Sequence, residues 1–269
     1  MNIVREDFNS IDEFLKSINT RKNNSIFENK NHSKTNDKSF TGTENYEEAE
    51  QLIKYGWEEP LKELKIANAI PNVSSYSSRR IPKNSIIGYA PCVPNAIRGI
   101  PESMINTQTI VQKTKTITIV FSNTANCMIG TNEFIKCGTT VIQLINSLES
   151  KGIRVKLLSN FYCAECGNEY AFGNVTIKDF KDKLDLKKLA FPIAHTSFFR
   201  RFGFKWIETC SGLTNNSWSD GYGKSMMEGY HVDIIKKNFI KENEVFINQR
   251  IIKSANYNVD ELIKNLNLK

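Results

Sequence analysis

The sequence predicts an α/β fold in which a mostly parallel sheet is flanked by helices. Residues 114–122, "TKTITIVFS", are rich in β-branched residues and apolar at nearly every position past Ile117, as in a central strand buried on both faces. An apolar stripe at helical spacing then runs through residues 131–152, and a second apolar strand starts at Ile153. Strand, helix and strand in direct succession predict a right-handed βαβ unit with parallel strands.

The chain before this unit divides into two parts. Residues 1–38 predict a flexible N-terminal tail with one short helix capped by Ser10, because the stretch after that helix is Asn, Lys and Ser with too few apolar residues to offset its ordering entropy. Residues 39–110 predict a helical and Pro-rich extension packed on the core. Its helix is expected to begin at a Thr43 cap and to end near Gly56, as the first half of a helical hairpin.

Five of the seven prolines lie in residues 71–109. Prolines at this density favour an extended segment laid over a neighbouring surface rather than an independent fold.

The remaining elements complete a domain over residues 111–269. The helix at 131–152 has its apolar stripe at Phe134, Val141, Leu144, Ile145 and Leu148, with Gly152 as a C-cap. The second strand runs into a hairpin: "CAECGN" reads as its turn and residues 169–180 as its third strand. A helix over 185–208, bent at Pro192, leads into a further strand, and a late strand at 242–252 and a closing helix at 258–268 follow.

A parallel βαβ unit whose second strand enters an antiparallel hairpin resembles the von Willebrand factor A-type fold, a Rossmann-like architecture. The segments "GYAPCVPNAIRGIPESMIN", "VIQLINSLESKGIRVKLL" and "LDLKKLAFPIAHTSFFRRFGFKWIE" also resemble a phage-associated family of unknown function (DUF7192-like) over residues 39–269. "AHTSFFRRFGF" is the most specific piece. The resemblance implies a phage or prophage source and a place in the cytoplasm of the bacterial host, or in the virion. It implies no activity.

The loop after the first strand is the first candidate site. In A-type domains the corresponding D-x-S-x-S loop holds a divalent cation through one carboxylate and two hydroxyls. Here Ser122 stands at the Asp position, and Thr124 and Asn126 stand at the two serine positions, so oxygens remain without the anionic charge. Three interpretations stay open: a turn that caps the next helix, a metal-free contact surface formed by Ser122, Asn123, Thr124 and Asn126, and a weak Mg²⁺ site at Ser122 and Thr124.

His195, Arg200 and Arg201 form the second candidate site. A histidine surrounded by phenylalanines favours a hydrogen-bonded core or interface residue over a catalyst. The two arginines could pair with an acidic partner, with Glu208 and Asp179, or with a phosphate.

Two further motifs carry little chemistry. Cys163-Ala164-Glu165-Cys166 could supply half of a zinc site or a redox pair, but a plain turn is favoured because no second such pair exists. "SDGYGKSMM" lacks the frame of a phosphate-binding loop and reads as a surface loop.

These observations favour a non-enzymatic A-type module that binds a phage or host protein at the sheet edge that carries the degenerate cation-site loop. The alternatives are a virion or assembly protein that uses the Pro-rich segment and the tail as arms, and an enzyme that acts on a phosphorylated substrate through His195, Arg200 and Arg201. The net charge of +7 permits contact with nucleic acid, but no long basic run supports it. Without an apolar run long enough for a membrane span, we expect no membrane partner, reduced cysteines, an intracellular location, and no cofactor other than weakly bound Mg²⁺.

Overall fold

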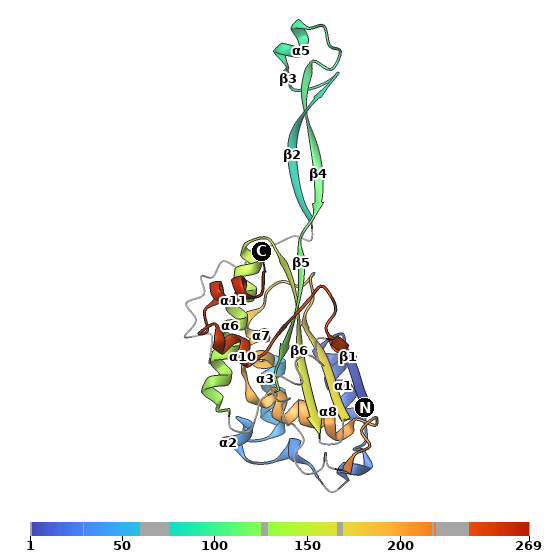
Figure 1. The fold of residues 1–269 in the computed structure, drawn as a ribbon, viewed down its shortest axis with the longest axis vertical. Coiled ribbons are helices and arrows are strands. Elements are labelled where there is room, and N and C mark those ends of the chain that lie inside the picture. The colour runs from blue at the N-terminus through green and yellow to red at the C-terminus, as the bar shows by residue number, and fades with distance from the viewer. Residues whose placement is uncertain are drawn as a thin grey trace. The chain divides into compact units, whose positions relative to one another are not determined.

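The chain forms two compact units in the computed structural model, which describes residues 2–28, 30–59, 76–124, 129–165, 169–216, 218 and 237–268. Met1–Asn72 and Thr116–Lys269 make up one, here called the globular unit, and Val73–Lys115 make up the other, called the hairpin unit. Figure 1 shows the elements of both. The boundaries predicted at residues 38 and 110 differ from this division, because the N-terminal residues belong to the globular unit.

A five-stranded sheet with the strand order β1-β7-β6-β5-β8 forms the centre of the globular unit. Its strands are β1 (Asn2–Phe8), β5 (Thr116–Ser122), β6 (Arg154–Glu165), β7 (Glu169–Lys178) and β8 (Glu244–Ile247). Neighbouring strands are parallel except for β6 and β7, which form an antiparallel hairpin. The prediction of a mixed α/β fold with a mostly parallel sheet flanked by helices is therefore confirmed.

The predicted βαβ unit is formed by β5, helix α6 (Thr131–Ser150) and β6. Ile119, Val120 and Phe121 of β5 are all buried, as expected of a strand with neighbours on both sides and cover on both faces. Every residue of the predicted apolar stripe of α6 is buried. Gly138 of this helix lies so close to α7 (Leu186–Ala194) that a β-carbon there would collide with Ala194.

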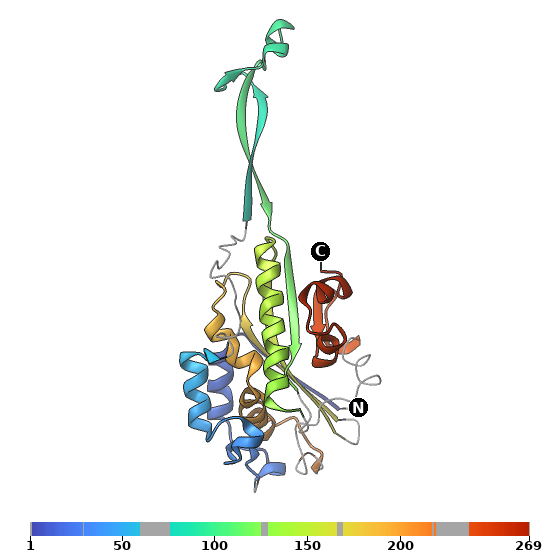
Figure 2. The same cartoon turned by 90° about the vertical axis from the view of Figure 1, so that its left-hand side faces the viewer.

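Helices cover one face of the sheet. α6 lies in the middle of this layer, with α1 (Ile11–Thr20) and α3 (Tyr46–Tyr55) on one side and α10 (Gln249–Ser254) and α11 (Val259–Asn265) on the other (Figure 2). On the opposite face a smaller cluster forms, in which the rings of Phe172 and Phe239 stack with their centroids 4.2 Å apart. The sheet thus has a covered interior on both sides.

The helix predicted over 185–208 is divided into three pieces. α7 ends at Ala194, two residues after Pro192, and is followed by a π-helix η3 (Phe198–Gly203) and by α8 (Phe204–Thr209). Pro192 cannot donate a backbone hydrogen bond, so the α-helical ladder does not continue unbroken across this region. No strand follows among residues 210–216, and residues 217 and 219–236, where the predicted strand could also fall, lie outside the described residues.

The prediction of a flexible tail over residues 1–38 is wrong. Asn2–Phe8 pairs in parallel with β7, α1 buries Phe14 and Ile18, and the 3-10 helix η1 (Ser25–Phe27) buries Phe27 completely. Short 3-10 and α-helical turns, η2 (His32–Lys34) and α2 (Lys38–Thr41), continue the ordered path. Ser10 caps α1 as predicted, since its side chain accepts a hydrogen bond from Glu13.

The cap of α3 also differs from the prediction. Asn45, not Thr43, accepts the capping hydrogen bond at the start of this helix, and Gly56 ends it as expected with a φ of 88°. The second half of the predicted helical hairpin, from residue 60 onwards, lies outside the described residues.

The hairpin unit is a three-stranded sheet in the order β2-β4-β3. β2 (Tyr76–Ser85) and β4 (Met104–Lys113) pair in antiparallel fashion over ten residues each, while β3 (Ala90–Pro91) pairs only with Ile105 and Met104. The helix α5 (Val93–Ile97) follows β3. The Pro-rich segment therefore has a fold of its own, contrary to the prediction of an extended segment.

The prolines are accommodated at positions that tolerate them: Pro82 lies in the outer strand β2, and Pro94 lies in the first turn of α5.

Candidate functional site

The loop after β5 is buried and hydrogen-bonded to neighbouring elements, and it is not an exposed edge. Ser122, Asn123 and Thr124 are 6%, 0% and 8% exposed. The amide Nδ2 of Asn123 donates to Ser159 Oγ at 2.7 Å and to the carbonyl oxygen of Pro192, and its backbone N–H donates to Asn160 O at 2.9 Å. These bonds tie the carboxyl end of β5 to β6 and α7. Asn126, the remaining member of the predicted site, lies outside the described residues.

A row of polar side chains crosses the sheet at this level. Ser122 is the register partner of Asn160, whose Nδ2 donates to Asn174 Oδ1 at 2.7 Å; Asn174 Nδ2 in turn donates to Asp7 Oδ1 at 2.7 Å. Partial burial raises the pKa of Asp7, but hydrogen bonds from Arg5 and Asn174 outweigh it and hold the pKa below its usual value. Sequence reasoning missed this row, because its members lie on four strands that are far apart in the chain.

His195 is an interior residue. Its ring stacks on Phe191 with centroids 4.9 Å apart and meets the Trp57 ring edge-on at 4.6 Å. Its Nδ1 accepts a hydrogen bond from the backbone N–H of Ser197 at 3.1 Å. Burial, and to a smaller extent the charge of Arg201, lowers the pKa of His195 to about 4. The imidazole is therefore neutral near pH 7, and its described contacts are those of a packing residue.

Arg200 and Arg201 point into the interior and hold the segment of residues 33–43. Arg201, which is fully buried, donates from Nε to Thr43 Oγ1 at 2.6 Å and from its other nitrogens to carbonyl oxygens of Ser33, Thr35 and Thr43. Arg200 donates to Phe40 O at 2.6 Å and lies over the Phe40 ring, 4.5 Å from its centroid. The two guanidinium groups thus fix a stretch of chain that has few apolar side chains of its own.

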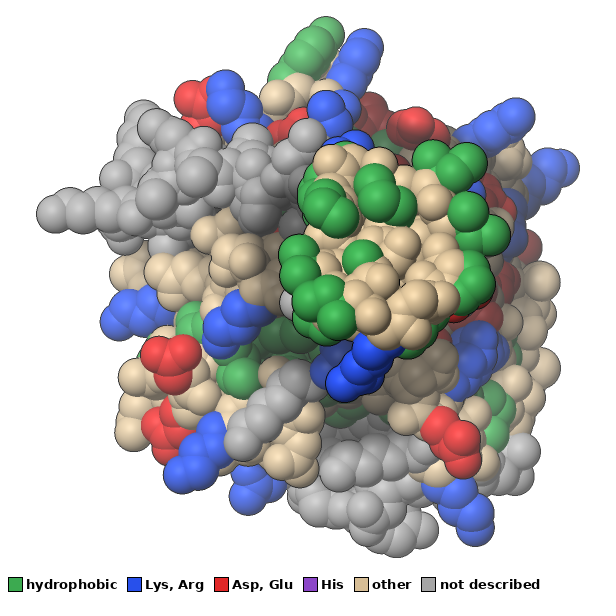
Figure 3. All heavy atoms as spheres, turned by 90° about the horizontal axis from the view of Figure 1, so that it is seen from above, with side chains coloured by type: hydrophobic (Ala, Val, Ile, Leu, Met, Phe, Trp, Pro, Cys, Tyr) green, Lys and Arg blue, Asp and Glu red, His purple; other side chains and the backbone are tan. Residues whose placement is uncertain are grey.

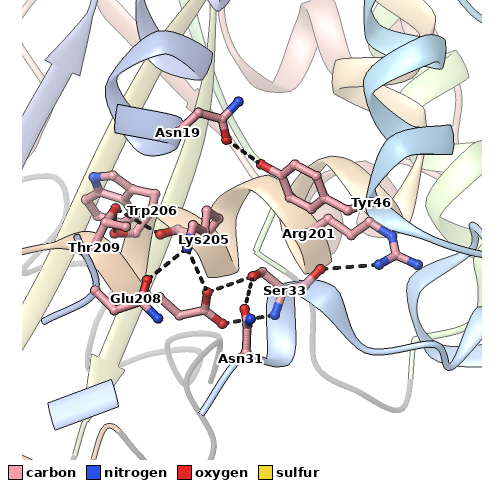
Figure 4. A network of polar contacts seen from close by, with 10 residues as sticks. Asn19, Asn31, Ser33, Tyr46, Arg201, Lys205, Trp206, Glu208 and Thr209 are labelled. Atoms are coloured by element: carbon pink, nitrogen blue, oxygen red, sulfur yellow. Dashed lines mark hydrogen bonds and ion pairs between the residues drawn. The ribbon is translucent and has the colours of Figure 1, made fainter. Parts of the chain in front are cut away.

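The expected pairing of these arginines with Glu208 and Asp179 is replaced by other contacts. Glu208 is fully buried and accepts from the backbone N–H and the Oγ of Ser33, at 2.9 Å and 2.6 Å. Figure 4 shows that Ser33 lies between Glu208 and Arg201, with its carbonyl oxygen directed to the guanidinium. Asp179 instead forms an ion pair with Lys156, at 3.7 Å. Ser33 is therefore the link that sequence spacing could not identify.

The cysteine motif contributes one buried thiol. Cys163 is buried in β6, and Cys166 lies outside the described residues, as does the "SDGYGKSMM" loop from Ser219 onwards. Cys92, Cys137 and Cys210 are free thiols. Within the part of the chain that the structure describes, no group of three or more His, Cys, Asp or Glu side chains is arranged to hold a metal ion.

Most of the large apolar side chains that are exposed in the described part of the chain lie in the hairpin unit. We call residues 86–103, which connect β2 to β4, the hairpin tip. The tip exposes Ile86 (70%), Ile87 (77%), Tyr89 (70%), Val93 (58%), Ile97 (81%) and Ile100 (37%). Sequence reasoning missed this surface because it treated the surrounding prolines only as signs of an extended segment. Isolated apolar side chains on a surface are ordinary, but a concentration of them indicates an interaction surface.

The net charge is also concentrated in the hairpin unit. Its residues 73–115 include six Lys or Arg and one acidic residue, Glu102, which gives +5 of the chain's total of +7. The net charge is therefore uneven along the chain, because acidic residues balance almost all of the basic residues of the globular unit.

Comparison with known proteins gives one match. The family model described as "Domain of unknown function (DUF7192)" matches residues 1–269. No curated protein and no solved structure matches the chain. Among the described residues, no helix is both long and apolar enough to cross a membrane.

Proposed function

Because the chain belongs to the DUF7192 family along its whole length, and that family has no known function, we propose from its geometry that it is a non-enzymatic protein-binding module of a phage or prophage. Its partner is a phage or host protein. In this proposal the globular unit is an A-type core that serves as a scaffold, and the contact with the partner is made by the hairpin unit. The support for an A-type core is the β5-α6-β6 unit followed by the β6-β7 hairpin.

The observation that carries this proposal is the free edge of β4. On one side β4 pairs with β2 throughout, but on the other side β3 covers only Met104 and Ile105. Within the described residues, the backbone groups that 106–113 direct to that side have no strand beside them. Such an edge can accept a strand from another protein, which gains backbone hydrogen bonds along its length.

The other edge of the hairpin unit is protected. β2 is the outer strand there, and it contains Pro82, which has no N–H to donate, and Lys83, which is exposed. Proline and lysine are the residues that discourage pairing at sheet edges. The β4 edge over 106–113 contains no proline and only one charged residue, Lys113, at its end. We therefore assign the partner strand to the β4 side.

Cross-linking in the host cell tests this assignment. A photoreactive amino acid at Thr109, exposed on β4, is expected to give a discrete adduct with a partner protein, whereas the same group at Lys264, exposed on α11, is not. The partner identified by mass spectrometry is then purified and its binding to the full chain is measured.

Proline substitutions make that binding assay specific for strand addition. Successive residues of an antiparallel strand direct their backbone groups to alternate sides, so one of Thr107→Pro and Gln108→Pro removes only an outward donor. We expect that variant to lose partner binding by about tenfold or more while it unfolds like the parent. Equal binding by both folded proline variants would contradict strand addition.

An enzymatic role is less well supported by the same geometry. His195, Arg200 and Arg201, which an enzyme for phosphorylated substrates would need at its surface, are buried and bonded to the protein's own backbone. A virion or assembly protein is the second candidate, since the hairpin unit is a compact unit of its own whose free β4 edge could accept a strand of a neighbouring subunit. Purified phage particles would contain the protein in that case, and would lack it if it acts only in the host cell.

Weak binding of Mg²⁺ at Ser122 and Thr124 is tested by thermal unfolding. A cation that binds only the folded state must raise the unfolding midpoint. Since Asn123 between these residues is bonded to Ser159 and Pro192, we expect the loop to act as a turn and the midpoint to stay constant on addition of Mg²⁺. A rise that Thr124→Ala abolishes would instead identify a working site.

A further inference from the structure

The hairpin tip presents large apolar side chains to solvent. Six of the seven large apolar side chains that are exposed among the described residues lie within residues 86–103; the seventh is Tyr55 of α3. Five of the six are aliphatic. A surface of this kind indicates contact with another apolar phase.

The exposure is built into an ordered backbone. Tyr89 N–H donates to Ile105 O at 2.9 Å, Cys92 N–H to Ser103 O at 2.6 Å, and Ile100 N–H to Asn95 O at 3.0 Å. Gly88 sits against the backbone of Ile105, where a β-carbon would collide with the carbonyl group. The tip is thus a closed structure that holds its apolar side chains outward.

The apolar side chains do not lie on one face. Seen end-on in Figure 3, hydrophobic side chains occur on several sides of the hairpin tip. A protein interface is a single patch with a buried centre and a polar rim. A fluid phase can instead surround a narrow tip on all sides, so this distribution favours the interfacial region of a lipid bilayer.

The positive charge of the hairpin unit favours a bilayer with anionic headgroups. Arg80, Lys83 and Arg98 are exposed, and Glu102 is the one acidic residue of residues 73–115. Basic residues beside an inserted apolar segment are attracted to anionic headgroups. The net charge of +5 on residues 73–115 disfavours a second copy as the occupant, because two hairpin units would repel each other. Nucleic acid is disfavoured because only one of the six exposed apolar side chains, Tyr89, offers a ring for stacking on bases.

We propose that the hairpin tip inserts its aliphatic side chains into the surface of an anionic lipid bilayer, with Arg80, Lys83 and Arg98 bound to the headgroups. Tyr89 suits this depth because its ring is apolar and its hydroxyl is polar. This membrane contact is separate from the strand addition at β4 residues 106–113, so a membrane-bound chain can still hold its protein partner.

Flotation with vesicles of defined composition tests the proposal. The full chain is expected to float with vesicles in which a quarter of the lipid is phosphatidylglycerol and the rest is phosphatidylcholine. It is expected to stay unbound with vesicles of pure phosphatidylcholine. Ile87→Ser combined with Ile97→Ser is expected to lower partitioning by about tenfold or more, because two exposed aliphatic side chains no longer insert. Lys83→Glu combined with Arg98→Glu should lower it by a similar factor and should remove most of its dependence on salt.

Matched controls separate insertion from general effects. Tyr55→Ser removes an equally exposed apolar side chain outside the tip, and Lys22→Glu reverses an exposed charge outside it; both should float like the parent. Unchanged circular dichroism of every variant shows that the fold is kept. The proposal is overturned if the parent does not bind the anionic vesicles, or if the double isoleucine variant binds them as well as the parent. It is also overturned if that variant loses only a concentration-dependent self-association, since the tip would then pack against a second copy.

Discussion

Arg201, one of two buried arginines in η3, illustrates how single residues hold this fold. Arg201 donates to three backbone carbonyls of residues 33–43 and to the hydroxyls of Thr41 and Thr43. In Figure 4 its guanidinium lies beside Ser33, which also binds Glu208. The stretch from residue 30 to 43 is polar, so these bonds substitute for apolar anchors that the sequence does not supply. This explains why composition predicted disorder where the structure has order.

Substitution of this arginine should be severe. Arg201→Met leaves buried carbonyl oxygens without donors, so we expect the free energy of unfolding to fall by about 3 kcal/mol or more. Urea denaturation followed by circular dichroism measures this change. Arg21→Met is the control, since Arg21 forms a partly exposed ion pair with Glu6 at 2.7 Å; it should change stability by less than about 1 kcal/mol. Similar losses in both variants would contradict the role given to Arg201.

His195 should make stability depend on pH. Its pKa in the folded protein is about 4, below the ordinary value of 6.5, so the unfolded chain binds a proton at a higher pH than the folded one does. The stabilisation is therefore complete above about pH 6.5 and is lost as the pH falls towards about 4, by up to about 3 kcal/mol. We expect His195→Gln to lose less stability than the parent between about pH 7 and about pH 5, as measured by urea denaturation. An identical pH dependence in the two proteins would show that this histidine does not titrate as described.

Helices α6 and α7 pack closely against each other at Gly138. A β-carbon at Gly138 would lie 2.8 Å from Ile193 O and would collide with Ala194. Alanine is favoured over glycine within a helix by about 1 kcal/mol, but overpacking of a fixed interface typically costs about 1 to 3 kcal/mol. The cost of overpacking is therefore expected to exceed the gain in helix propensity.

We accordingly expect Gly138→Ala to lower the thermal unfolding midpoint, although it raises helix propensity. Gly130→Ala is the control, because Gly130 precedes α6 with a φ of −74° and a β-carbon added there would meet no atom within 4 Å. Its midpoint should stay within a few degrees of the parent's, because the substitution is expected to change the free energy of unfolding by about 1 kcal/mol or less. A Gly138→Ala variant that unfolds at or above the parent's midpoint would show that the two helices can move apart.

The elements that the sequence predicted well are those whose own residues decide their structure. β5 and α6 have strong periodic patterns, and both form as expected because both are buried in the sheet and helix layers. The edge strand β1 was missed because Asn2–Phe8 buries only Phe8 and depends on its pairing with β7, whose first residue, Glu169, is the partner of Asn2. The hairpin unit was missed because its prolines lie at an outer strand and a helix start, where they interrupt nothing.

The candidate site was predicted less well than the fold. Ser122, Asn123, Thr124, His195, Arg200 and Arg201 were chosen for their chemistry, and all six are buried. Their partners are mostly backbone atoms of distant segments, which no pattern of side chains reveals. The membership in the DUF7192 family was anticipated from sequence blocks, and the match extends to residue 1, beyond the predicted start at residue 39.

At the scale of the whole molecule, the two units should be separable. The hairpin unit enters and leaves through adjacent ends, since Tyr76 is the register partner of Lys113. Replacement of residues 73–115 by a short glycine-serine linker is therefore expected to leave the globular unit folded, with a single cooperative transition near the parent's midpoint. Differential scanning calorimetry checks this outcome. Loss of the transition would mean that the globular unit needs the hairpin unit to fold.

The order in which the chain is synthesised gives the pairing of β1 with β7 a further consequence. Asn2 is synthesised before its partner Glu169, which is made only after the 166 residues between them. At about 5 to 20 residues per second, β1 waits on the order of ten to thirty seconds for its partner. The segment at residues 33–43 waits about as long, because Arg200 follows Phe40 by 160 positions and Arg201 follows Ser33 by 168. Residues 2–8 and 33–43 thus lack these partners while the chain between is made, and they dock onto a sheet that β5 and β6 have already begun to form.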